Sequence, residues 1–192
     1  MTQQANILLI DNNDSFTFNI VDLLRGIENC NFQVINSEEL DLHDLDLFTH
    51  VIISPGPMTP ADYPVLENVI SYCLKNRKPL LGICLGHQAI GTYFGAKLTR
   101  LDQVIHGQQH TIEVTQKNNL LDSLPNSFPV GLYHSWVLST VNFPEELEIT
   151  AYSKELIMAI QHKTSPIYGI QFHPESFLTS RGKKILINFL SL

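Results

Sequence analysis

The sequence predicts an α/β fold built on a doubly wound, open and mainly parallel sheet that is flanked by helices. Strand-like apolar runs alternate with helical patterns through the first half of the chain, which is the rhythm of successive β-α-β units. In the second half, short strand-like runs follow one another, and helical pattern is scarce until residues 182–190. We therefore expect additional antiparallel strands in the second half, which extend the sheet or cover one side of it.

Apolar runs predict the strands, and apolar residues at helical spacing predict the helices. The strands are expected at residues 7–10, 32–35, 50–54, 79–83, 110–114, 129–133, 148–152, 157–161 and 167–172. The first helix has Asp14 or Ser15 as a candidate N-cap, followed by apolar residues at helical spacing: Phe16, Ile20, Leu23, Leu24 and Ile27. The second covers residues 63–75 with one apolar face: Leu66, Val69, Ile70 and Leu74. A third helix is expected directly after residue 84, and a fourth over residues 182–190.

Length and composition indicate one ordinary globular domain over residues 1–192, with 44% hydrophobic and 16% charged residues. A net charge of −7 without a basic run argues against nucleic acid and anionic membranes as partners. The first residues lack the charge and apolar core of a signal peptide, and no apolar stretch approaches a membrane span. The three cysteines lack the spacing of a disulfide scaffold, which is typical of a protein of the reducing cytoplasm. The sequence contains no zinc-site motif and no other cofactor motif.

The most informative local feature is a lone cysteine between two glycines at the end of a strand. Gly82, Cys84 and Gly86 form a G-x-C-x-G turn between the run 79–83 and a helical pattern, as in a nucleophile elbow. Glycine is expected at both flanking positions because the turn is too tight for side chains, and the helix N-terminus behind the thiol favours the thiolate. A buried structural cysteine is the alternative, and it is our interpretation of Cys30 and Cys73.

A candidate base follows the last predicted strand. His173 and Glu175 come directly after the run 167–172, and a nucleophilic thiol needs both a base and an acid that orients it. Carboxyl ends of strands meet at one edge of an open α/β sheet, so Cys84 and His173 are expected to meet there. His134 is less suitable as the base because no acidic residue adjoins it. The alternative is that residues 173–175 only form a turn that leaves the sheet.

These motifs resemble those of the triad-type (class I) glutamine amidotransferases. The resemblance rests on GICLGHQ at 82–88 and QFHPES at 171–176. It is narrowed by LLIDNNDSFTFN at 8–19, SPGPMTP at 54–60 and YHS at 133–135, which are similar to the small glutaminase subunit of anthranilate synthase and aminodeoxychorismate synthase. The resemblance covers residues 7–190 and implies a flavodoxin-like sheet and hydrolysis of the glutamine side-chain amide.

The resemblance also implies a role for each motif residue. Cys84 would attack the amide to give a γ-glutamyl thioester, His173 would protonate the departing ammonia, and Glu175 would orient the imidazole. The oxyanion would be held by two backbone amides, that of Leu85 after the nucleophile and, by resemblance, that of Gly56. Glutamine-binding residues by the same resemblance are Gly56, Pro57, Met58, Gln88, Ser135 and Trp136. For all of these except Gly56, an ordinary structural role remains open: a turn for Pro57 and Met58, a solvated helix residue for Gln88, and a packed strand end for Ser135 and Trp136.

Two departures from the family pattern concern the glutamine loop and the partner. Met58 stands where relatives often have a second glycine, and Gln108 stands where they often have lysine. The resemblance implies ammonia transfer to a chorismate-binding synthase subunit, either anthranilate synthase component I or aminodeoxychorismate synthase component I. That partner is expected to need Mg²⁺, whereas this chain is expected to need no cofactor. The segments 11–19 and 106–108 are candidates for its interface.

The product branch, tryptophan or folate, stays open at this stage, with Met58 slightly favouring folate, and two other functions stay open as well. A stand-alone cysteine hydrolase such as a γ-glutamyl hydrolase would share the elbow. A catalytically inactive binding subunit would share the fold, and only Met58 and Gln108 favour it.

Overall fold

A single nine-stranded sheet organises the computed structural model, which describes residues 4–192, and its strand order is β2-β1-β3-β4-β9-β8-β7-β5-β6. The first five strands in that order are parallel to one another. They are β2 (Cys30–Asn36), β1 (Ala5–Asp11), β3 (His50–Ile53), β4 (Leu80–Ile83) and β9 (Ile167–Ile170). β3, β4 and β9 are buried along their whole length, as expected for parallel strands covered on both faces.

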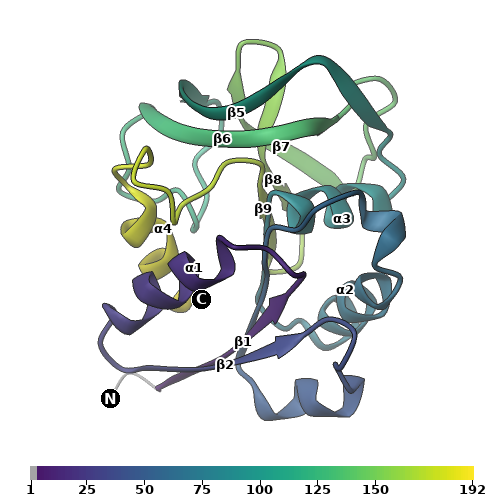
Figure 1. Ribbon diagram of the computed structural model, residues 1–192, viewed down its shortest axis with the longest axis vertical. Coiled ribbons are helices and arrows are strands. Elements are labelled where there is room, and N and C mark those ends of the chain that lie inside the picture. The colour runs from purple at the N-terminus through teal and green to yellow at the C-terminus, as the bar shows by residue number, and fades with distance from the viewer. Residues whose placement is uncertain (1–3) are drawn as a thin grey trace.

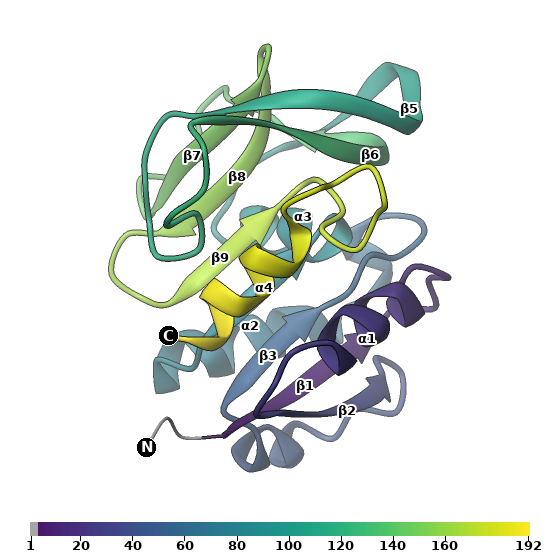
Figure 2. The same cartoon turned by 90° about the vertical axis from the view of Figure 1, so that its left-hand side faces the viewer.

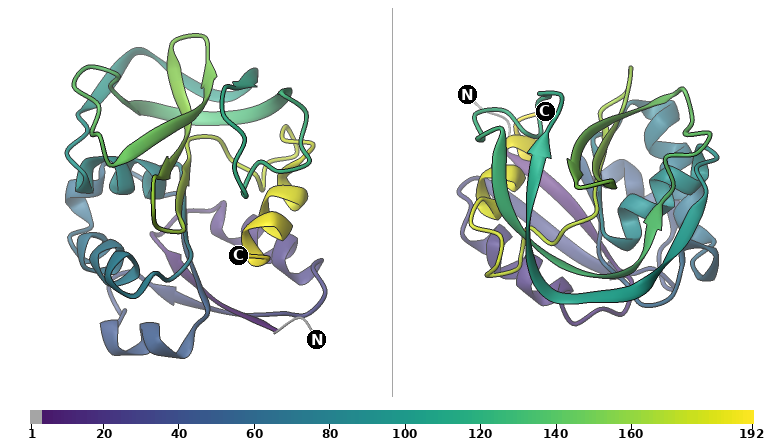
Figure 3. Two further views of the ribbon diagram at one scale, coloured as in Figure 1. Left: turned by 180° about the vertical axis from the view of Figure 1, so that it is seen from behind. Right: turned by 90° about the horizontal axis from the view of Figure 1, so that it is seen from above.

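The other four strands are antiparallel and continue the sheet beyond β9. They are β8 (Leu156–His162), β7 (Leu147–Ser153), β5 (Leu98–Val114) and β6 (Ser127–Leu138). β5 and β6 form a long, curved pair above the parallel strands (Figures 1 and 2). Seen from above, the pair bends across one end of the molecule (Figure 3).

Helices cover both faces of the parallel part of the sheet (Figure 1). α1 (Thr17–Arg25) and α4 (Gly182–Leu190) pack their apolar sides into one core, and α2 (Val65–Asn76) and α3 (Leu85–Tyr93) pack into a second core on the opposite face. Two short 3₁₀ helices, η1 (Leu42–Leu47) and η2 (Pro60–Asp62), lie in the connections. None of the helices in residues 4–192 is long and apolar enough to cross a membrane.

The predicted α/β architecture is confirmed, with the parallel strands in the first half and at β9 and antiparallel strands in the second. α4 has the predicted bounds, whereas α2 begins two residues later than predicted. The prediction of Asp14 or Ser15 as N-cap of α1 is wrong, because Phe16 occupies that position. Asp14 acts earlier, since its Oδ1 accepts a hydrogen bond from the Phe16 N–H at 2.8 Å and so forms a turn before the helix.

Candidate active site

Cys84 lies in a strained turn between β4 and α3. Its backbone has φ 51° and ψ −98°, which is a sparsely populated conformation for a residue with a side chain. A Cβ on Gly82 would lie 2.3 Å from the carbonyl carbon of Gly86, and one on Gly86 would lie 2.7 Å from the Ile53 carbonyl oxygen. The predicted reason for both glycines is therefore confirmed. The Cys84 N–H donates to the Ile170 carbonyl at 2.8 Å, which joins the turn to β9.

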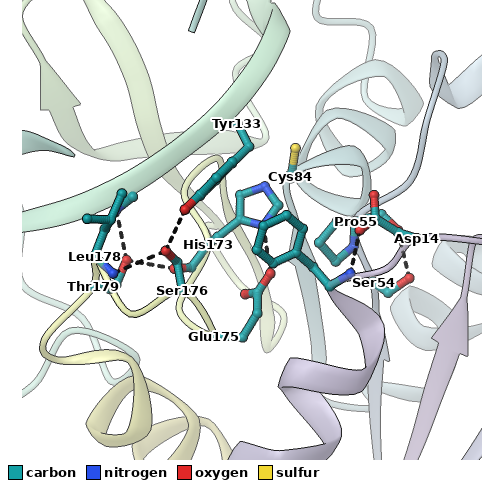
Figure 4. Close-up of polar contacts among 12 residues, drawn as sticks. Asp14, Ser54, Pro55, Cys84, Tyr133, His173, Glu175, Ser176, Leu178 and Thr179 are labelled. Atoms are coloured by element: carbon teal, nitrogen blue, oxygen red, sulfur yellow. Dashed lines mark hydrogen bonds and ion pairs between the residues drawn. The ribbon is translucent and has the colours of Figure 1, made fainter. Parts of the chain in front are cut away.

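His173 and Glu175 form a buried pair beside this turn. The His173 Nδ1 lies 2.6 Å from Glu175 Oε1, and both side chains are almost completely buried. Figure 4 shows the imidazole between the Cys84 sulfur and the Glu175 carboxylate. The His173 backbone is held by a bridge to Gly131 on β6, with the His173 N–H donating to the Gly131 carbonyl at 3.1 Å. The sheet therefore fixes the imidazole from β6 as well as from β9.

The charges around His173 favour its protonated form. Burial lowers the pKa of His173, but the Glu175 charge and the adjacent Cys84 sulfur raise it by more, so its pKa lies above the ordinary 6.5. Its Nε2 is buried without a hydrogen-bond partner among residues 4–192. Because Nδ1 is engaged by Glu175, Nε2 is the nitrogen left to exchange a proton at the sulfur.

His134 has the opposite environment. Burial lowers its pKa to about 4, and the nearby His173 charge contributes to this. A histidine with so low a pKa accepts a proton poorly, and among the described residues no carboxylate pairs with His134 to raise it, so it is a poor candidate for the base. The Glu175 carboxylate 2.6 Å from His173, which has no counterpart at His134 among the described residues, therefore supports the choice of His173.

Two backbone N–H groups close to Cys84 have no hydrogen-bond partner in the described part of the chain. A Cβ on Gly56, in the loop after β3, would lie 2.4 Å from Leu85 Cδ2, so the Gly56 loop and the elbow are in close contact. Within residues 4–192, neither the Gly56 N–H nor the Leu85 N–H donates to another group of the chain. Unused amides on a loop and on the adjacent first residue of α3 are what an oxyanion hole needs.

The Gly56 loop is anchored by Asn12, which the sequence places in the candidate interface segment 11–19 without a role in holding this loop. Asn12, which directly follows β1, donates from its Nδ2 to the Ser54 carbonyl at 2.9 Å and from its backbone N–H to Ser54 Oγ at 3.0 Å. In the sequence, Asn12 stands out only as part of the 8–19 motif. Its position directly after a predicted strand is the signal that could have identified it, because the ends of β1 and β3 are neighbours.

Met58 keeps a glycine-like backbone in this loop. Its φ is 67°, in the left-handed region, and its side chain is 70% exposed. The backbone at position 58 is therefore in a conformation that glycine adopts more readily than methionine. Pro57 is exposed as well, so of the loop residues expected to bind glutamine only Gly56 packs closely against the elbow.

Gln88 and Trp136 meet directly. Gln88, one turn into α3, donates from Nε2 to the Trp136 carbonyl at 2.9 Å. Ser135 precedes Trp136 on β6 and is half-buried. The predicted glutamine-binding residues of α3 and β6 thus lie together next to the elbow, and the guanidinium of Arg100 lies 6.0 Å from the centre of the Trp136 ring.

An aromatic cluster joins the two candidate interface segments to His173. The Phe16 ring lies 4.7 Å from Tyr133 and 5.0 Å from His173, and His106 lies 5.3 Å from Tyr133, all between ring centres. The Tyr133 hydroxyl also shares a hydrogen bond with Ser176 Oγ at 3.0 Å (Figure 4). The segments 11–19 and 106–108 therefore lie close to the edge of the sheet that carries Cys84 and His173, which we call the catalytic edge. Gln108 itself is exposed.

Comparison with known proteins shows which family this chain belongs to. The glutamine amidotransferase class-I family matches residues 8–192. The chain belongs to this family. The amidotransferase chain is 45% identical to a Haemophilus influenzae protein named provisionally as anthranilate synthase component II, over 97% of this chain and 96% of the relative. It is 42% identical to anthranilate synthase component 2 of Cyanophora paradoxa, over 96% of this chain and 98% of the relative.

A solved structure has the same architecture. The amidotransferase chain superposes with a TM-score of 0.86 on a Thermoplasma acidophilum protein that is described provisionally as one of the subunits of a GMP synthase. The two are 28% identical, and the match covers 97% of this chain and 92% of the other. The fold and the glutamine amidotransferase activity are thus those of the family, whereas the named products of the relatives differ.

The other cysteines of the amidotransferase chain have the properties of structural residues. Burial raises the pKa of Cys73 to about 12, and burial also raises the pKa of Cys30 above 9.0. Because the thiolate is the reactive form, both are poor nucleophiles at neutral pH. This agrees with the prediction that only Cys84 is reactive.

Proposed function

We propose that this chain is the glutaminase subunit of a chorismate-converting synthase, and that it hydrolyses L-glutamine through Cys84, His173 and Glu175. The observation that carries the proposal is the buried His173–Glu175 pair, at 2.6 Å, beside a cysteine in a strained elbow. In the first step the thiolate attacks the amide carbon, and His173 gives its proton to the departing ammonia. In the second step, water assisted by His173 cleaves the thioester and releases glutamate.

The free backbone amides of Gly56 and Leu85 would stabilise the oxyanion that forms in both steps. Removing one such donor typically lowers kcat by about 100- to 1000-fold. The glutamine main-chain groups would be held at Gln88, Ser135 and Trp136, beside the loop of Pro57 and Met58. The chemistry of these steps needs no metal or cofactor from this chain, and Mg²⁺ would be required by the partner synthase.

The partner we propose is anthranilate synthase component I, which would receive the ammonia through a channel. This choice is supported by relatives at 39–45% identity named as anthranilate synthase component II, against 28% for the relative described as part of a GMP synthase. It is also supported by large apolar side chains around the catalytic edge, with Phe177 91% exposed and Phe18 67% exposed. Exposed aromatic residues of this kind are typical of a protein interface.

A labelling experiment tests both the activity and the partner. Chorismate, Mg²⁺ and amide-¹⁵N glutamine are supplied to this chain mixed with anthranilate synthase component I or with aminodeoxychorismate synthase component I, and mass spectrometry follows the label. Label in anthranilate supports the proposal. Label only in aminodeoxychorismate would assign the folate branch instead, and label in both products would indicate a glutaminase shared by the two synthases.

The Cys84→Ser variant is the control for the triad. It should abolish synthesis from glutamine but keep synthesis from free ammonia, because the partner synthase is unchanged. Survival of glutamine-dependent synthesis would refute the assignment of Cys84. Hydrolysis of γ-glutamyl peptides by this chain alone would favour a stand-alone hydrolase. We further propose that residues 1–192 act as one amidotransferase domain in the cytoplasm, in keeping with the free cysteines.

A further inference from the structure

Gln171 is a buried polar residue that lies against the nucleophile and has no role in the triad. It follows β9, two residues before His173, and is fully buried. Its side-chain Nε2 lies 3.6 Å from the Cys84 sulfur, within hydrogen-bond distance for a sulfur acceptor. Burial of a primary amide is unfavourable unless its donors and acceptor are used, so this contact requires an explanation.

A chain of amides fixes the orientation of Gln171. Its Oε1 accepts a hydrogen bond from Gln88 Nε2 at 3.2 Å, and the same Gln88 nitrogen donates to the Trp136 carbonyl at 2.9 Å. Since Gln88 presents its donor side to Gln171, the Gln171 oxygen must face Gln88 and its nitrogen must face the sulfur. The backbone supports this arrangement, because the Gln171 N–H donates to the Met158 carbonyl at 2.9 Å.

An N–H donor directed at the sulfur affects the two forms of Cys84 unequally. A hydrogen bond to a charged acceptor is about twice as strong as one to a neutral acceptor, so the donor favours the thiolate over the thiol. Burial strengthens this preference, since water does not compete for the sulfur at a residue that is 6% exposed. Unlike His173, an amide donor exchanges no proton, and it can hold the sulfur while the imidazole serves the leaving group.

We propose that Gln171 is a further catalytic residue, whose side-chain amide donates a hydrogen bond to the Cys84 sulfur and stabilises the thiolate that attacks glutamine. The same bond stabilises the thiolate that leaves when the thioester is hydrolysed. The chain from Trp136 through Gln88 and Gln171 to Cys84 also links the glutamine-binding residues to the nucleophile. This inference rests on the glutaminase chemistry proposed above.

The test uses two substitutions that remove the donor and keep the size of the side chain. Gln171→Met has no hydrogen-bonding group, and Gln171→Glu replaces the donor by an acceptor. The first measurement is the rate of Cys84 alkylation by iodoacetamide as a function of pH, followed by mass spectrometry of the Cys84 peptide. The loss of a hydrogen bond to a charged group predicts an alkylation rate at pH 7 that is about 10- to 100-fold lower in Gln171→Met. Gln171→Glu should lower the rate at least as much.

The second measurement is glutamine hydrolysis in the complex with the partner synthase. Gln171→Met should lower kcat by the same factor as alkylation, with a smaller change in KM. Gln161→Met is the matched control, because Gln161 also uses its side-chain amide, in a hydrogen bond to Glu148, but lies on β8 opposite Tyr168, near the other end of β9. It should alkylate at the wild-type rate.

Two results would overturn the proposal. One is a Gln171→Met variant with the wild-type pH profile of alkylation and a lower unfolding temperature, which would make the residue structural only. The other is an equal loss of Cys84 alkylation in Gln161→Met. Alkylation needs neither glutamine nor a partner, so a wild-type chain that is alkylated at Cys84 but does not hydrolyse glutamine would refute the proposed function while leaving the hydrogen bond to the sulfur measurable.

Discussion

His50 is expected to make the chain less stable in mild acid. It is the first residue of β3, is 6% exposed, and packs its ring edge against Phe189 of α4 at 5.2 Å between ring centres. Burial lowers the pKa of His50 to about 4, and the charge of Lys78 contributes to this. In the unfolded chain the side chain takes up its proton near pH 6.5.

The sign and size of the effect follow from these two values. Between pH 6.5 and about 4, the unfolded chain binds a proton at His50 that the folded chain does not bind, so stability falls as the pH falls. At pH 5 this difference lowers the free energy of unfolding by about 2 kcal/mol, against about 0.2 kcal/mol at pH 7. Above pH 7 the contribution of His50 no longer changes.

The assay is urea unfolding at pH 7 and pH 5, followed by circular dichroism, for the wild type and His50→Asn. The substitution changes stability at both pH values, but the difference between them should shrink by about 2 kcal/mol because the titrating group is gone. His43→Asn removes an exposed histidine of η1 and should keep the wild-type difference. An unchanged difference in His50→Asn would show that the burial of this imidazole does not control its protonation.

Three substitutions test the elbow, its loop and the triad. Gly82→Ala should lower the free energy of unfolding by more than about 3 kcal/mol, because the new Cβ would lie 2.3 Å from the Gly86 backbone. In the control Gly26→Ala the new Cβ would lie 3.4 Å from its nearest neighbour, so the free energy of unfolding should change by less than about 0.5 kcal/mol. Urea titration measures both variants. Met58→Gly should raise the free energy of unfolding by about 0.5 kcal/mol, because glycine adopts a φ of 67° without strain. A higher melting temperature would show this gain. Glu175→Gln should lower kcat for glutamine by about 100-fold or more, because the pKa of His173 loses the charge that raises it; steady-state glutaminase assays give the value.

The parallel part of the sheet could be predicted because its strands are short apolar runs between turn residues. β3, β4 and β9 are fully buried, so their sequences carry almost no polar residue to interrupt the pattern. The first part of β5 lacked this signal, since most residues from 98 to 111 are exposed and pair only with β6. Its register also shifts twice, between Arg100 and Ile105 and between His106 and Gln108, which disrupts the alternation that marks a strand.

Some residues of the candidate site could likewise be predicted from the sequence, and others could not. The positions of Cys84, His173 and Glu175 followed from local patterns, because each occupies a turn directly after a predicted strand. The Asn12 anchor and the Phe16–Tyr133–His173 cluster depend on which strand ends are neighbours, and that order follows from the sheet topology. Local patterns carry no information on such pairings.

The contrast between Cys84 and Gln171 shows why one catalytic group is visible in a sequence and another is not. The elbow stores backbone strain of the order of 1–3 kcal/mol at Cys84, and its geometry is available only if positions 82 and 86 lack a Cβ. That requirement appears in the sequence as two glycines at fixed spacing. The amide of Gln171 makes no demand on its neighbours in the chain, since its partners Gln88 and Cys84 are more than eighty residues away. Its environment exists only once α3 and β9 have packed together, so a group that acts through tertiary contacts alone has to be found in the folded structure.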